Sequence, residues 1–216
     1  MLNWDSIDVV LLDMDGTLLD LHFDDYFWRE HVPHRFSEKN GIPFEQARQE
    51  LFDRYRAVQG TLDWYCVDYW SRELGLDIPV LKEEVDHLIA LHPHVPDFLE
   101  RIRQLGKKAV LVTNAHGKSL ALKMKRTRIG DSLDGLVCAH DLGLPKEDPA
   151  FWRRLKSVVP FDERRTLLVD DNLDVLESAR RHGIRYLVSV IQPSTRRPPR
   201  AIEGFRAIHS FREITP

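Results

Sequence analysis

Short apolar runs recur along the chain, and each of them ends in a polar segment. The clearest run spans residues 9–12 and enters a turn that contains a glycine. The others are residues 109–112 before Thr113-Asn114, residues 166–169 before Asp170-Asp171-Asn172, residues 185–190 before Gln192-Pro193, and a weaker run at residues 136–138. Apolar runs of this length, bounded by turn residues, predict buried β-strands.

Segments with apolar residues at helical spacing lie between these runs. They are residues 96–105, 118–128, 149–158 and 173–182. Gly106, Gly130 and Gly183 follow three of these segments, as is usual where helices end. Strands that alternate with helices favour an α/β fold, in which a Rossmann-like parallel sheet is covered by flanking helices.

Residues 23–91 break this alternation, because they contain several amphipathic stretches and no convincing strand. The predicted helices span residues 24–36, 44–58, 62–74 and 80–90. We therefore predict an all-helical cap, residues 21–92, inserted after the first strand of a core that is formed by residues 1–20 and 93–216. An insertion at this point can lie over the first loop of the core.

Composition narrows the range of partners. The chain has 31 Lys and Arg against 34 Asp and Glu. Its net charge of -3 would not attract the protein to a nucleic acid polymer or an anionic membrane. No apolar run approaches the roughly 20 residues that span a bilayer, and the N-terminus does not have the pattern of a signal peptide. We expect a cytoplasmic protein with two buried free thiols, Cys66 and Cys138. The sequence does not indicate which oligomeric state the protein has.

Two basic segments are interpreted as solvent-exposed. Residues 196–200 combine arginine with proline, which is typical of a solvated linker. The helical segment that carries Lys118, Lys123, Lys125, Arg126 and Arg128 is interpreted as a solvated face. Near the C-terminus, Ser210-Phe211-Arg212-Glu213 has capping-box spacing and predicts a short final helical turn.

The polar residues after the three clearest strands should converge, because ligands bind at the carboxyl ends of the strands in an open parallel sheet. These residues are Asp13 and Asp15, Thr113 and Asn114, and Asp170 and Asp171. Four carboxylates in one crevice repel each other unless a cation lies among them, and Mg²⁺ prefers oxygen ligands. Lys146, in a proline-flanked loop before a helix, could stabilise charge on a transferring phosphoryl group.

In this order the residues resemble the four motifs of the haloacid dehalogenase superfamily. The segment Asp13-Met14-Asp15-Gly16-Thr17 is similar to the first motif, Thr113 to the second, Lys146 to the third, and Asp170-Asp171 to the fourth. The resemblance implies that Asp13 attacks phosphorus to form an aspartyl-phosphate, and that Asp15 protonates the leaving group and then activates water. Dehalogenases of the superfamily lack the second aspartate, so Asp15 favours phosphoryl transfer.

The resemblance also implies a ligand set. Mg²⁺ would be held by the Asp13 side chain, the Asp15 backbone carbonyl and Asp171, while Thr113 would donate a hydrogen bond to a phosphoryl oxygen. Asp170 is expected to act through water or to orient Lys146. Asp174 is expected at the surface.

The cap sequence is rich in aromatic residues, which bears on the substrate. Trp64 and Tyr65 either pack the cap against the core or stack on a planar group such as a nucleobase. The segments 13–20, 23–28, 62–70, 113–116 and 145–148 resemble the bacterial GMP/IMP 5'-nucleotidases. This implies that a purine nucleoside monophosphate is the substrate, with Thr113, Asn114, Lys146, Trp64 and Tyr65 as binding residues. A phosphatase for sugar phosphates or phosphoglycolate, a phosphomutase and a non-catalytic nucleotide-binding module remain alternatives.

Overall fold

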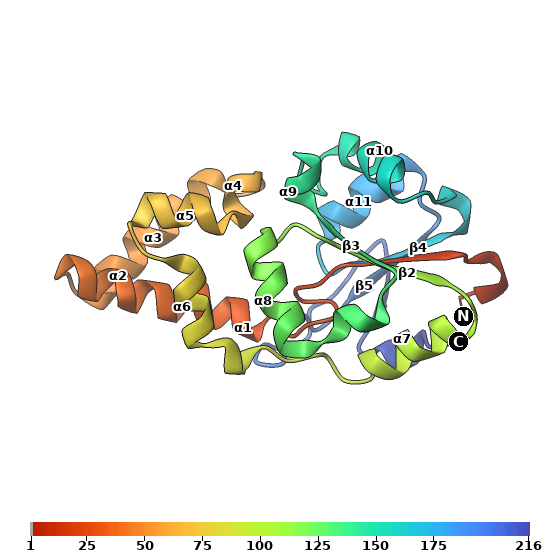
Figure 1. The fold of residues 1–216 in the computed structure, drawn as a ribbon, viewed down its shortest axis with the longest axis horizontal. Helices are drawn as coiled ribbons and strands as arrows, with labels where there is room; N and C mark the ends of the chain where they lie inside the picture. The colour runs from red at the N-terminus through yellow and green to blue at the C-terminus, as the bar shows by residue number, and fades with distance from the viewer. Residues whose placement is uncertain (1) are drawn as a thin grey trace.

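A computed structural model describes residues 2–216 and contains a six-stranded parallel sheet with the strand order β3-β2-β1-β4-β5-β6 (Figure 1). The strands are β1 (Val9–Leu12), β2 (Lys108–Thr113), β3 (Gly135–Cys138), β4 (Thr166–Val169), β5 (Tyr186–Val190) and β6 (Arg206–Ile208). The first strand is central and pairs with both β2 and β4. The predicted α/β fold and all five predicted strands are confirmed.

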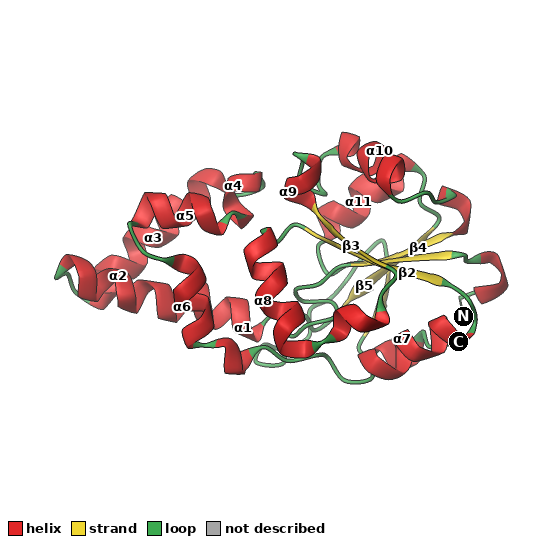
Figure 2. Cartoon of the chain, viewed as in Figure 1, coloured by secondary structure: helices red, strands yellow, loops and turns green. Residues whose placement is uncertain are grey.

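Helices cover both faces of the sheet (Figure 2). They are α7 (Val95–Gln104) and α8 (Gly117–Thr127) on one face, and α9 (Ala139–Leu142), α10 (Pro149–Val158) and α11 (Leu173–His182) on the other. Alternate residues of β1 point to opposite faces: Val10 and Leu12 belong to the core around α7, and Leu11 to the core around α10 and α11. Burial on both faces explains why the strand sequences are apolar throughout.

The segment between β1 and α7 is entirely helical in its regular structure and lies to one side of the sheet (Figure 1). Its α-helices are α1 (His22–Tyr26), α2 (Val32–Asn40), α3 (Phe44–Val58), α4 (Leu62–Tyr65), α5 (Val67–Leu74) and α6 (Ile78–Glu84). The predicted all-helical cap after the first strand is therefore confirmed. Its division from the core at residues 20/21 and 92/93 remains a prediction.

Three cap helices differ from their predicted bounds. The first continues from α1 through a π-helical turn, Phe27–His31, into α2, so it extends beyond residue 36. The predicted helix 62–74 is interrupted at Cys66, whose extended backbone lets its Sγ accept a hydrogen bond from the first turn of α5. The last α-helix ends at Glu84 and is followed by a short 3₁₀ turn, Asp86–Leu88.

The C-terminal segment contributes more to the fold than its sequence predicts. Arg206–Ile208 forms β6 and pairs in parallel with β5. Residues 196–200 are exposed, as the solvated-linker interpretation predicts. They also contact the core, because the Arg200 guanidinium donates a hydrogen bond to the backbone carbonyl of Asp171. The predicted capping box at Ser210 and Glu213 is present. Among residues 2–216, no helix has the length and apolar character needed to cross a membrane.

Trp152 provides a test of the packing between α10 and α11. Its side chain is fully buried, and its indole N–H donates to Ser178 Oγ at 2.9 Å. Trp152→Ala should lower the free energy of unfolding by roughly 3–5 kcal/mol. Val158→Ala, on the same helix at a position that is 56% exposed, should change it by less than about 0.5 kcal/mol. Urea unfolding followed by circular dichroism measures both, and equal losses would contradict this packing.

Candidate active site

A tight turn after β1 places Asp13 and Asp15 at the carboxyl edge of the sheet. The Asp13 amide still bonds to the Val169 carbonyl of β4 at 3.0 Å, after which the chain turns back on itself. Gly16 has φ +87°, a left-handed conformation that side chains disfavour, and its N–H donates to Leu19 O at 2.8 Å. The turn leaves the carbonyl of Asp15 without a hydrogen bond from any described residue.

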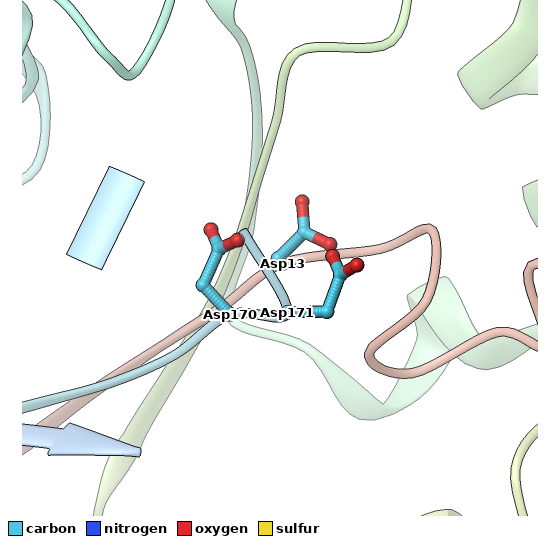
Figure 3. A group of neighbouring side chains, drawn as sticks. All are labelled: Asp13, Asp170 and Asp171. Carbon is cyan, nitrogen blue, oxygen red and sulfur yellow. The ribbon is translucent and has the colours of Figure 1, made fainter. Parts of the chain in front are cut away.

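Three carboxylates converge at this edge. Asp13 follows β1, and Asp170 and Asp171 follow the neighbouring strand β4. One ligand oxygen from each lies within 4.8 Å of the others, and Figure 3 shows the three side chains grouped at the strand ends. Like charges at this separation repel strongly in a buried site, so the group requires positive charge nearby.

Lys146 supplies part of that positive charge. Its side chain is only 2% exposed, and its Nζ lies 2.5 Å from Asp13 Oδ1 and 2.7 Å from Asp170 Oδ2. It also donates to the Val112 carbonyl at 3.1 Å. Burial alone would lower the pKa of Lys146, but the two carboxylates outweigh burial and raise it, so the group is an ammonium. Burial and Asp13 raise the pKa of Asp170 to about 7 despite Lys146.

Of the three carboxylates, Asp171 has the fewest positive or hydrogen-bonding groups close to its negative charge. No described residue donates a hydrogen bond to its side-chain oxygens, and the Arg200 guanidinium, which donates to the Asp171 backbone carbonyl, lies 3.8 Å from Oδ2. Burial, Asp13 and Asp170 together raise the pKa of Asp171 well above its usual range. The Asp171 side chain is 17% exposed, and its carboxylate, the Asp13 carboxylate and the Asp15 carbonyl are oxygen donors of the kind that a hard divalent cation such as Mg²⁺ prefers.

Thr113 and Asn114, at the end of β2, lie beside this group. Thr113 is buried, and its Oγ1 accepts from the Ala115 amide at 3.0 Å. The Asn114 side chain accepts from the Lys146 amide at 2.9 Å and donates to Glu147 Oε2 at 2.9 Å. Asn114 therefore fixes the loop that carries Lys146.

Glu147 is a residue that the sequence analysis did not select. Its carboxylate accepts hydrogen bonds from Tyr65 Oη at 2.8 Å, from Asn114, and from Asn172 Nδ2 at 3.1 Å. Tyr65 belongs to α4 of the cap, whereas the other partners belong to the core. The sequence feature that could have identified Glu147 is its position directly after Lys146. Glu147 joins the cap to the loop that carries this lysine.

The structure corrects the solvated-face interpretation of α8 at one residue. Lys123 is only 1% exposed, and its Nζ lies 2.6 Å from Asp15 Oδ1 and 2.6 Å from Asp24 Oδ2. Burial raises the pKa of Asp15 to about 6, although Lys123 opposes the shift. Asp15 can therefore hold or release a proton near neutral pH, as an acid–base group must. Asp174 is exposed, as expected.

A cleft of about 860 Å³ extends from the carboxylates toward the cap. Its lining includes the aromatic residues Trp28, Phe52, Tyr55, Trp64, Tyr65 and Trp70. Trp64 also packs edge-on against Tyr55, with ring centroids 5.9 Å apart. Trp64 thus packs within the cap and also lines the cleft, so stacking on a planar group stays a prediction for this residue.

Comparison with known proteins agrees with this geometry. The family model for haloacid dehalogenase-like hydrolases matches residues 7–183. The chain belongs to this family. The match includes all the carboxylates described above and Lys146, and it spans both the cap and most of the sheet.

Individual relatives of this hydrolase differ in their named activities. The chain is 39% identical to the GMP/IMP nucleotidase YrfG of Escherichia coli (strain K12) over 99% of its own length and 96% of that protein. It is 25% identical to an (S)-2-haloacid dehalogenase of Pseudomonas sp. (strain YL), covering 83% and 81% of the two chains. The crystal structure of a HAD phosphatase from Thermococcus onnurineus superposes with a TM-score of 0.80 at 24% identity, covering 96% of each chain, which shows the shared fold.

The turn at Gly16 provides a test of the site in this hydrolase. A Cβ at this position would lie 2.8 Å from Asp171 Cγ, in addition to the strain of a left-handed backbone. Gly16→Ala should therefore lower the free energy of unfolding by roughly 2–4 kcal/mol. Gly41→Ala is the matched control, because Gly41 is also left-handed but its Cβ would meet nothing within 4 Å. Only about 1 kcal/mol is expected there. Equal losses in urea unfolding would contradict the contact with Asp171.

Proposed function

We propose that this hydrolase is a Mg²⁺-dependent 5'-nucleotidase that removes phosphate from GMP and IMP through an aspartyl-phosphate on Asp13. The observation that carries the substrate assignment is the 39% identity to a GMP/IMP nucleotidase over nearly the whole of both chains, cap included. The substrate is then a small purine nucleoside monophosphate. A cytoplasmic location is part of the same proposal.

In the first step, a carboxylate oxygen of Asp13 attacks phosphorus while the bond from phosphorus to the nucleoside oxygen breaks. Asp15 donates its proton to that oxygen, so the nucleoside leaves as an alcohol. Lys146, whose ammonium bonds to Asp13, and the Thr113 hydroxyl stabilise the negative charge of the phosphoryl group. When bound by Asp13, the Asp15 carbonyl and Asp171, Mg²⁺ supplies further positive charge at the phosphoryl oxygens.

In the second step, water attacks phosphorus of the aspartyl-phosphate and Asp15, now ionised, takes a proton from it. The bond between phosphorus and Asp13 breaks, and inorganic phosphate leaves. Asp15 is thereby protonated again and ready for the next substrate. The same carboxyl group must act as acid and then as base, which suits its pKa of about 6.

The shape and lining of the cleft support a nucleoside as the leaving group. The aromatic side chains offer flat apolar surface at the cap end, on which a purine base can stack. A substrate as small as phosphoglycolate would leave most of the cleft of about 860 Å³ unfilled. Such phosphatases and the phosphomutases remain the alternative functions.

A phosphate-release screen in Mg²⁺ tests the proposed function. We expect GMP and IMP to be hydrolysed well above AMP, ribose 5-phosphate and phosphoglycolate, and Asp13→Asn to abolish release because it lacks the nucleophile. Chelation with EDTA should abolish activity, and added Mg²⁺ should restore it. Turnover limited to phosphoglycolate or sugar phosphates would refute the nucleotidase assignment, and an isomerised ester without free phosphate would indicate a mutase.

Trp64→Ala tests whether the cap holds the base. If the indole stacks on a purine, its loss should raise KM for GMP by roughly 5- to 100-fold, the equivalent of about 1–3 kcal/mol. Ribose 5-phosphate, which carries no base, is the internal control, and its kcat/KM should change little. An equal loss with both substrates would assign Trp64 to cap packing alone.

A further inference from the structure

Four charges of alternating sign, of which the two lysines are buried, connect Asp15 to the cap. Asp15 Oδ1 bonds to Lys123 Nζ at 2.6 Å, Lys123 Nζ bonds to Asp24 Oδ2 at 2.6 Å, and Asp24 Oδ1 bonds to Lys82 Nζ at 2.8 Å. Asp15 and Lys123 belong to the core, on the β1 turn and on α8. Asp24 and Lys82 belong to cap helices α1 and α6. Figure 1 shows α8 on the side of the core nearest these helices.

Lys123 is an unusual group to bury. Its side chain is 1% exposed, and removing an ammonium from water costs several kcal/mol unless close partners compensate. An anchor between core and cap would require only the contact to Asp24. Lys123 instead divides its ammonium equally between Asp24 and Asp15, so it makes a specific contact with the acid–base group.

The contact restricts which oxygen of Asp15 can react. Oδ1 is occupied by Lys123, whereas Oδ2 accepts no hydrogen bond from any described residue. Asp15 also lines the cleft, with its side chain 21% exposed. Oδ2 is therefore the oxygen left to give a proton to the leaving group and to take one from water. A carboxylate held through one oxygen keeps the other in a defined orientation.

We propose that Lys123 is a positioning residue for Asp15, and that Asp24 of the cap holds Lys123 in place for this role. The inference rests on the proposed function in that it takes Asp15 as the proton donor. Cap position then affects proton transfer directly, because displacing α1 would remove one of the two carboxylates that hold the Lys123 ammonium.

Two substrates with different leaving groups separate this role from a structural one. The leaving group of GMP is the nucleoside alkoxide, which needs a proton, whereas the leaving group of p-nitrophenyl phosphate is a stable phenolate, which needs none. Lys123→Met should lower kcat/KM for GMP by roughly 10- to 100-fold, which is part of the full effect of a general acid. The value for p-nitrophenyl phosphate should fall less than about threefold on the same reasoning. Lys125→Met, at an exposed position of α8, is the matched control and should change neither value.

A double-mutant cycle with Asp15→Asn shows whether Lys123 acts through Asp15. The ratio of interest is kcat/KM for GMP divided by kcat/KM for p-nitrophenyl phosphate. In the Asp15→Asn background, adding Lys123→Met should leave this ratio unchanged, because the group that Lys123 positions has lost its function. Equal losses for both substrates in the single variant, or a further fall of the ratio in the double variant, would overturn the proposal. Asp24→Asn should lower the ratio in the same direction, and an unchanged ratio would overturn the role of the cap.

A second variant covers the possibility that Lys123→Met does not fold. Without Lys123, Lys82 is the one lysine among residues 2–216 that still forms an ion pair with either carboxylate of Asp15 and Asp24. The double variant Lys123→Met with Asp24→Asn keeps the two charges balanced, and the same fall in ratio is expected. If the wild type hydrolyses ribose 5-phosphate but not GMP, the nucleotidase proposal fails, while the Lys123 test proceeds with ribose 5-phosphate as the alkoxide substrate.

Discussion

The repulsion among carboxylates at the ends of β1 and β4 is the constraint on which the site depends. Asp13, Asp170 and Asp171 place ligand oxygens within 4.8 Å of one another in a largely buried setting. Lys146 bonds to two of these side chains, and no residue in the described part of the chain donates a hydrogen bond to the Asp171 carboxylate. The remaining negative charge disfavours an empty site and favours both a divalent cation and the phosphate that such a cation attracts.

The topology explains why these groups meet and why the cap lies above them. The central strand β1 has β2 and β4 as neighbours, so polar residues after all three strands share one edge. Asp20 lies between the turn after β1 and the first cap helix, and its carboxylate accepts hydrogen bonds from the His22 and Thr195 amides. After the cap helices, the His92 ring contacts the Pro193 carbonyl at 3.0 Å. The loop that contains Pro193 and Thr195 therefore contacts the chain both before and after the cap helices.

The sequence predicted the parts of the fold that depend on local patterns. The helices α3, α10 and α11 have the predicted bounds, because their apolar spacing and end residues are contained within each segment. The strand β6 was missed, because three residues are too few to show alternation. Lys123 was misassigned for another reason: its partners Asp15 and Asp24 are 108 and 99 residues away, so the basic character of α8 gave no sign of its burial. Glu147 was missed for the same reason, because its partners Tyr65, Asn114 and Asn172 are 82, 33 and 25 residues away.

The row of charges formed by Asp15, Lys123, Asp24 and Lys82 shares side chains with the aromatic cleft, so the cleft lining and the Asp15 carboxylate are physically linked. The Lys82 ammonium, which bonds to Asp24, lies 4.4 Å from the Phe27 ring centroid and 5.5 Å from that of Trp28. Trp28 in turn lines the cleft. Aromatic faces stabilise a buried cation, and a displacement of Trp28 would alter the surroundings of Lys82 and hence the position of Asp24. Because Asp24 also holds Lys123, a change at the cap end of the cleft can reach Asp15 through contacts shorter than 6 Å.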